Sequence, residues 1–167
     1  METDMSIEKV RAYLRPLGLE DRIQEFDVSS ATVELAAAAL GVEGARIAKS
    51  LSFKIDDRPI IVVAAGDAKV DNSRYKAQFH TKAKMLTHQE AHEWIGHDVG
   101  GVCPFALPDN VEVYLDVSVQ RFETVYPAAG SANSAIPLSC GELEQYASGF
   151  RAWVDVCKGW RPGEVGQ

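Results

Sequence analysis

Apolar and polar residues recur along the chain with a mixture of helical and strand periods. Helical patterns, each preceded by a residue able to cap a helix N-terminus, occur at 7–14, 34–40, 72–79, 88–94 and 141–147. Strand patterns occur at 22–27, 50–55, 60–65, 111–115, 122–126, 135–138 and 153–156. The run Ile60 to Ala65 is apolar throughout, which predicts a buried strand, and the turn at 56–59 makes it the second arm of a hairpin.

The order of these elements predicts the fold class. Strands and helices are intermixed without regular βαβ spacing, which favours an α+β fold with a curled, mixed, barrel-like sheet and flanking helices. The stretch from Gly96 to Pro108 is rich in glycine and proline and predicts a loop. The chain contains no internal repeat or linker, so we expect one domain over residues 1–160 and a flexible tail over 161–167.

Composition narrows the class of protein further. Of the 167 residues, 46% are apolar and 25% are charged, a balance typical of a globular domain. No apolar run approaches the roughly 20 residues of a membrane span, and the acidic N-terminus lacks a signal-peptide core, so we expect no membrane partner. Three widely spaced cysteines indicate free thiols in a reducing cytoplasm (Cys103, Cys140 and Cys157).

Charge is unevenly distributed. The net charge of −7 argues against a protein that grips a long stretch of nucleic acid, because such proteins present a basic surface. Between Lys69 and Met85, however, five basic residues stand against one acidic residue, Asp71. This segment is either a solvated helix face or a small nucleic-acid contact. Its basic residues are Lys69, Arg74, Lys76, Lys82 and Lys84.

Three short segments carry residues suited to a binding site. Lys49 stands at the entry of the hairpin, where an ammonium can polarise a carbonyl, although lone lysines also lie on surfaces. The adjacent Gly100 and Gly101 let the backbone N–H groups approach an anion or a carbonyl oxygen, or simply make a turn. The segment 130–133 offers a glycine turn with a hydroxyl and an amide, which bind a ligand or cap the turn itself.

Taken together and in this order, these segments resemble the YbaK/ProX family. The motifs that carry the resemblance are residues 46–51, 64–67, 99–105 and 130–135, and the similarity runs from about Ser30 to Ala147. The resemblance implies the family's curled mixed sheet with flanking helices. It also implies hydrolysis of the ester that joins an amino acid to the 3′ end of transfer RNA, with no cofactor and no metal.

The same resemblance assigns roles to individual residues. It implies catalytic roles for Lys49 and for the backbone of Gly100 and Gly101. Substrate-binding residues are expected near them (Ser50, Asp67, Phe105, Gly130, Ser131 and Asn133). Some relatives use a histidine or an aspartate near the Gly-Ser turn to shape the pocket, whereas this neighbourhood offers Asn133, so the amino acid recognised stays open. The expected tRNA contacts are Lys69, Arg74 and Lys76.

Two rival constellations point to other chemistry. His88 and His92 have the i, i+4 spacing of metal ligands, but Gln89 stands where a zinc protease needs its glutamate. Cys103 follows His97 by six residues, which allows a thiol nucleophile only if the histidine acts as its base. Polar surface and core packing are the ordinary roles of these residues.

We therefore expect a cytoplasmic trans-editing hydrolase that acts on small amino acids such as alanine, serine or cysteine attached to proline tRNA. Its expected partners are the tRNA acceptor end and an aminoacyl-tRNA synthetase. Two other classes remain open at this stage. They are a non-catalytic module that binds a nucleotide or an aminoacyl group, and a protein that docks on a synthetase.

Overall fold

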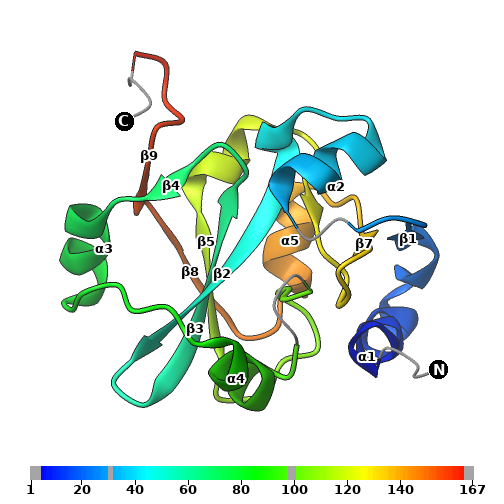
Figure 1. The fold of residues 1–167 in the computed structure, drawn as a ribbon, viewed down its shortest axis with the longest axis horizontal. Coiled ribbons are helices and arrows are strands. Elements are labelled where there is room, and N and C mark those ends of the chain that lie inside the picture. Colours follow the sequence, from blue (N-terminus) through cyan, green and yellow to red (C-terminus); the bar gives the residue numbers. More distant parts are fainter. Residues whose placement is uncertain (1–4, 30–31, 98–100, 164–167) are drawn as a thin grey trace.

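The computed structural model describes residues 5–29, 32–97 and 101–163. A five-stranded sheet forms its centre, in the order β6-β2-β3-β5-β8 (Figure 1). Strands β2 and β3 pair antiparallel, whereas the pairs β2–β6, β3–β5 and β5–β8 are parallel. The sheet is therefore mixed, as predicted. These strands are β2 (Ile47–Ile55), β3 (Arg58–Ala65), β5 (Glu112–Asp116), β6 (Tyr126–Pro127) and β8 (Phe150–Val154).

Helices and short pairs of strands surround this sheet. The helices are α1 (Met5–Leu14), α2 (Val33–Leu40), α3 (Asn72–Phe79), α4 (His88–Glu90) and α5 (Cys140–Tyr146). Two minor antiparallel pairs join β1 (Gln24–Glu25) to β7 (Ser134–Ala135) and β4 (Lys69–Val70) to β9 (Cys157–Lys158). Helix α1 and strand β9 lie on opposite sides of the molecule in this view (Figure 1). None of the helices described is long and apolar enough to span a bilayer.

The hairpin of β2 and β3 is the most regular part of the fold. Its strands pair over eight positions, from Ala48 opposite Ala65 to Ile55 opposite Arg58. Residues Ile60 to Ala65 have no exposed surface, because β3 lies between β2 and β5 and both of its faces are covered. The continuous apolar run therefore forms a buried strand, as predicted.

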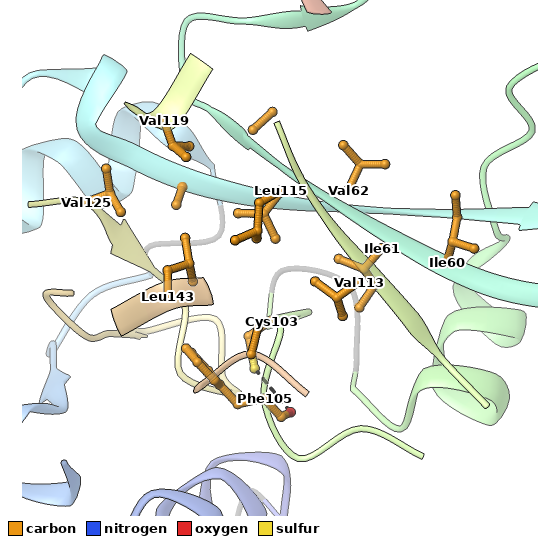
Figure 2. Packing of buried hydrophobic residues seen from close by; sticks show 14 of the residues in the cluster. Ile60, Ile61, Val62, Cys103, Phe105, Val113, Leu115, Val119, Val125 and Leu143 are labelled. Atoms are coloured by element: carbon orange, nitrogen blue, oxygen red, sulfur yellow. Dashed lines mark hydrogen bonds between the residues drawn. The ribbon is translucent and has the colours of Figure 1, made fainter. Parts of the chain in front are cut away.

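The two faces of the sheet bury different side chains. Val113 and Leu115 pack with Phe105, Cys103 and Leu143 of α5 on one face (Figure 2). On the other face a chain of aromatic rings joins the sheet to α3, with ring centroids 4.7–5.1 Å apart; it runs Phe53, Tyr75, Phe79, Tyr114. Successive residues of β5 thus serve opposite faces. A register shift between Val113 and Tyr114 adds local bend to the sheet.

Helix boundaries follow their capping residues closely. Asp71, Thr87 and Ser139 each accept backbone N–H bonds at the start of a helix, and the last two form capping boxes with Glu90 and Glu142. The first helix was predicted to begin at Ile7 with Ser6 as its N-cap, but it begins at Met5 and includes Ser6, so this capping prediction was wrong. The helix predicted to run through Trp94 is α for only three residues and continues as a π turn, Ala91–Ile95.

The short strands were predicted less well. The stretch 122–126 was expected to be a strand, but only Tyr126 belongs to one, and a 3-10 helix, Val117–Arg121, precedes it. The strand expected at 135–138 is confined to Ser134–Ala135, with a single further bridge between Val125 and Leu138. The last predicted strand begins earlier, at Phe150, and ends at Val154.

The predicted tail divides into two parts. Residues 164–167 lie outside those described. Arg161 stacks over the ring of Trp160, with 4.3 Å between the guanidinium carbon and the ring centroid, and binds the carboxylate of Asp155 at 2.5 Å. The described start of the segment is therefore packed on the domain.

Candidate functional site

A cavity of about 450 Å³ opens beside the N-terminal half of β2. Its volume lies in the range of small-molecule binding sites. The lining comes from six separate parts of the chain and is mostly apolar. The lining residues are Thr32, Val33, Ala36, 47–52, Met85, Leu86, His88, Val102, Tyr126, Ala128, Ser134 and Ala135.

Lys49 is a half-buried member of this lining. Its ammonium donates to the backbone carbonyl oxygens of Ala68 and Gly66, the latter at 3.4 Å, in the turn that follows β3. Burial lowers the pKa of Lys49, because desolvation disfavours the charged form. The Lys49 side chain is thus held in place by main-chain atoms, and no carboxylate bonds to it directly in the described chain.

Two acidic side chains, Asp67 and Cys157, lie near Lys49 and differ in whether they carry a negative charge at neutral pH. The charge of Asp67 raises the pKa of Lys49 and offsets part of the desolvation. A Cys157 thiolate would do the same, but burial raises the pKa of this thiol, so it is neutral at neutral pH. Asp67 is therefore the more effective of the two in keeping Lys49 protonated. Glu34 acts in the same direction, and Lys69 opposes it.

Asp67 itself is held by Arg121. The guanidinium of Arg121 binds both carboxylate oxygens of Asp67, at 3.0 and 2.5 Å, and also donates to the carbonyl of Trp160 at 3.3 Å. The same guanidinium lies between two aromatic rings, 4.9 Å from Phe122 and 5.0 Å from Trp160. A bidentate pair of this kind fixes the turn that holds Lys49. Asp67, expected to bind substrate, is outside the cavity lining.

Glycines bring distant motifs into direct contact. A Cβ on Gly101 would lie 2.9 Å from the Cα of Ser131 and 3.0 Å from the carbonyl oxygen of Gly130. The predicted glycine loop and the predicted Gly-Ser turn therefore touch through their backbones. Gly100, the other predicted catalytic glycine, lies outside the described residues.

The Gly-Ser turn directs its polar side chains inward. The Ser131 hydroxyl lies 2.9 Å from Asn133 Oδ1 and 2.8 Å from Ser134 Oγ, and the Asn133 amide donates to the carbonyl of Phe26 at 2.9 Å. Gly130 takes a left-handed φ of 99°, which glycine adopts without strain. In this structure Ser131 and Asn133 support the cavity wall, and Ser134 is the member of the network that lines the cavity.

Phe105, expected to contact substrate, is not part of the cavity lining. Its side chain has no exposed surface, and its ring packs 6.4 Å from that of Tyr13, in the core beside Leu143 (Figure 2). The Phe105 ring, which follows the glycine loop, lies in the interior because burial of a large aromatic side chain is strongly favourable in free energy.

The thiol-nucleophile alternative also fails on geometry. Burial raises the pKa of the Cys103 thiol to about 12. Its sulfur lies 3.6 Å from His97 Nε2, but this nitrogen is 2.9 Å from the carbonyl oxygen of Phe105 and must donate its proton there. A nitrogen that carries a proton cannot accept one from the thiol. Cys103 is a core residue.

The metal alternative gains no support from the structure. His88 lines the cavity, but in residues 5–29, 32–97 and 101–163 no three side chains of histidine, cysteine, aspartate or glutamate come together as metal ligands. The three cysteines are all free.

The predicted basic segment lies on β4, α3 and the loop after it. Lys69, Arg74 and Lys76 are all exposed, but Arg74 pairs with Asp155 at 3.4 Å and with Asp71 at 3.9 Å. A second cavity of about 410 Å³ lies here, and Lys76 and Lys82 supply its positive charge. Asn72, Ser73 and Ala83 complete its described lining.

Several cavity residues gave no signal in the sequence. Val33, Met85, Tyr126 and Ala128 belong to patterns typical of ordinary core or surface positions, and Val102 lies in the motif 99–105 but was not among the expected site residues. Met85 keeps 59% of its surface exposed, which is unusual for a large apolar side chain at a cavity. Only the tertiary fold brings these five residues to one place.

Comparison with known proteins adds independent information. The model of the aminoacyl-tRNA editing domain family matches residues 27–146. The uncharacterized protein YwhH of Bacillus subtilis is 52% identical over 157 residues, which cover 93% of this chain and 99% of that protein. The proline–tRNA ligase of the same organism is 34% identical over 103 residues, 61% of this chain but only 18% of the ligase.

A solved structure matches in three dimensions. It is described as "a putative trans-editing enzyme for prolyl tRNA synthetase" and superimposes with a TM-score of 0.83 at 24% identity. The match covers 95% of this chain and 100% of the other. At this identity the likeness establishes the fold, a curled mixed half-barrel with helices.

The contact between Gly101 and the Gly-Ser turn makes a prediction for stability. Gly101→Ala adds a Cβ at 2.9–3.0 Å from backbone atoms and should lower the free energy of unfolding by about 1–3 kcal/mol. Chemical denaturation measures this. Gly141→Ala is the matched control, because its Cβ meets nothing nearer than 3.9 Å. Equal midpoints for the two variants would show that the two motifs do not constrain each other.

Proposed function

Because this chain belongs to the aminoacyl-tRNA editing domain family, also called the YbaK/ProX family, we propose that it is a trans-editing hydrolase that deacylates mischarged tRNA. The observation that carries the proposal is the cavity that combines an apolar lining with the half-buried Lys49. The proposal includes a cytoplasmic location, where its partners, the tRNA acceptor end and an aminoacyl-tRNA synthetase, are found.

The proposed reaction is hydrolysis of the aminoacyl ester. Water attacks the ester carbonyl carbon, negative charge develops on the carbonyl oxygen, and the bond to the ribose oxygen breaks to give a free amino acid and tRNA. Lys49 holds the substrate or stabilises the developing charge. The backbone N–H groups of Gly100 and Gly101 stabilise the same charge or bind the terminal ribose phosphate. A hydroxyl of the substrate itself orients the water.

The cavity supports a small amino acid as the group removed. Apolar side chains of α2, β2 and β6 surround it, and they leave about 450 Å³ for the amino acid and part of the terminal nucleotide. Alanine, serine and cysteine are the proposed substrates, on proline tRNA. The similarity to 18% of a proline–tRNA ligase supports this choice of tRNA. An apolar pocket separates side chains that differ by one methylene only by about 1–3 kcal/mol, so a separate editing site is useful.

The first test removes the cation. Lys49→Ala should reduce deacylation of mischarged proline tRNA by about 10²–10³-fold, because a stabilising charge is lost from the transition state. Initial rates over a panel of mischarged tRNAs measure the effect and identify the amino acid. A thermal melt checks that the variant is folded. A folded Lys49→Ala protein with wild-type rates contradicts the proposal. If the wild-type protein binds mischarged tRNAs but hydrolyses none of them, it is a binding module instead.

The pH dependence offers a second test. The ammonium of Lys49 is present below its pKa, which lies under the ordinary 10.5, so the rate should fall as pH rises through that lowered value. In Asp67→Asn the carboxylate that favours the charged form is absent, and the fall should move to lower pH. Rates corrected for uncatalysed ester hydrolysis provide the profile. If the rate falls over the same pH range in wild type and Asp67→Asn, the fall does not come from deprotonation of Lys49.

The third test concerns the binding of tRNA by the basic segment. Lys76 and Lys82 are the better pair to change, because Arg74 is engaged by Asp71 and Asp155. Lys76→Ala with Lys82→Ala should raise KM several-fold and flatten its salt dependence, with little change in kcat, because these residues bind ground and transition states alike.

A charge-matched control is available for this pair. Gln120→Glu with Gln145→Glu lowers the net charge by the same two units at exposed positions away from the second cavity. If both double variants raise KM equally, overall charge and not this site is responsible. If neither does, the basic segment is a solvated surface.

A further inference from the structure

The outer edge of β2 is bare between two paired stretches. On the side away from β3, β6 pairs with β2 only at Ile47 and Ala48. Further along, Leu86 N–H donates to the Ser52 carbonyl at 3.1 Å, and Lys54 N–H donates to the Lys84 carbonyl at 2.9 Å. Among the residues that the structure describes, no strand or loop is hydrogen-bonded to this edge between Ala48 and Ser52.

The register shows which backbone groups face the gap. Along a strand, successive residues direct their N–H and C=O groups to opposite edges. Ser52 and Lys54 direct theirs outward, so Ser50, two residues earlier, does the same. The hairpin agrees, since Lys54 lies opposite Pro59, which has no N–H to offer across the strand pair. Ser50 therefore presents one donor and one acceptor to the gap.

The gap opens into the candidate site. Ala48, Ser50 and Ser52 all line the large cavity, with Ala128 from the β6 side and Leu86 from the other side. Backbone N–H and C=O groups in protein interiors are nearly always paired. A free donor and acceptor at the edge of a strand form a template for a short extended ligand, as in peptide recognition by strand addition.

We propose that the bare edge at Ser50 binds the amino-acid part of the substrate as a short added strand. The Ser50 carbonyl accepts a hydrogen bond from the α-ammonium group, and the Ser50 N–H donates to the ester carbonyl oxygen. The inference rests on the proposed deacylase function and defines its substrate class: esters of amino acids with a free, charged α-amino group. An N-acylated amino acid loses that charge and must fit its acyl group between Ala128 and Leu86.

The proposed bonds come from the main chain of Ser50 and not from its side chain. The Ser50 hydroxyl is buried without a hydrogen-bond partner in the described chain, and the proposed bonds use only the main-chain N–H and C=O of this residue. Ser50→Pro removes the N–H at an edge position, where proline is compatible with a strand, and should raise KM or lower kcat by about tenfold or more. Because the proline variant can fail to fold, the decisive measurement uses the unaltered protein.

That measurement is amide NMR with a non-hydrolysable ligand. The probe is an adenosine that carries alanine through a 3′-amide, and its matched control is the same compound acetylated on the alanine nitrogen. The free-amine compound should shift the Ser50 amide resonance and slow its hydrogen exchange by about tenfold. The Leu51 amide points toward β3 and should not change. The acetylated compound should bind at least about tenfold more weakly.

The outcomes distinguish this inference from the proposed function. Deacylation of mischarged tRNA together with equal binding of the two compounds, or with an unchanged Ser50 amide, would overturn the inference and leave the function intact. Absence of deacylation and of binding would overturn both. Binding of the free amine with protection of Ser50 supports the inference whichever amino acid proves to be the substrate.

Discussion

The antiparallel pairing of β2 with β3 is the constraint on which the site depends. Its eight-position register brings Lys49 opposite Ala64, one residue before the end of β3, so that the ammonium reaches the carbonyls of Gly66 and Ala68. The same register directs the backbone of Ser50 to the outer edge. A slip of one residue would exchange the two faces and the two edges at once. Because β3 is buried on both faces, its apolar side chains hold the register firmly.

Close backbone contacts assemble the rest of the site around this hairpin. A Cβ on Gly66 would lie 2.0 Å from the carbonyl oxygen of Gly44 and 2.8 Å from Val33, so the turn after β3 lies directly against the segment that leads into β2. Gly101 meets Gly130 and Ser131 in the same way. At such distances only glycine fits, and the cavity walls are fixed by main-chain packing and not by long side chains.

Electrostatics near the site follows from burial more than from net charge. Desolvation lowers the pKa of Lys49, and the pair of Asp67 with Arg121 lies beside the turn that holds the ammonium. Arg121 is in turn stacked between Phe122 and Trp160, and Trp160 lies beyond residue 146, where the family match ends. The C-terminal segment of this chain therefore helps to set the charge environment of Lys49. A protein with a net charge of −7 can still present a locally positive surface at Lys76 and Lys82.

The sequence by itself determined the hairpin, the capped helices and the mixed character of the sheet, because apolar periodicity and capping chemistry act over a few residues. Its motifs also identified Lys49 and Ser50, which line the cavity. The sequence could not show that Phe105 turns into the core or that Arg121 holds Asp67, since both depend on residues far apart in the chain. Short strands such as β6 and β7 have only two residues each and exist through their partners. The bare edge at Ser50 is likewise a property of where β6 stops, and only tertiary packing decides that.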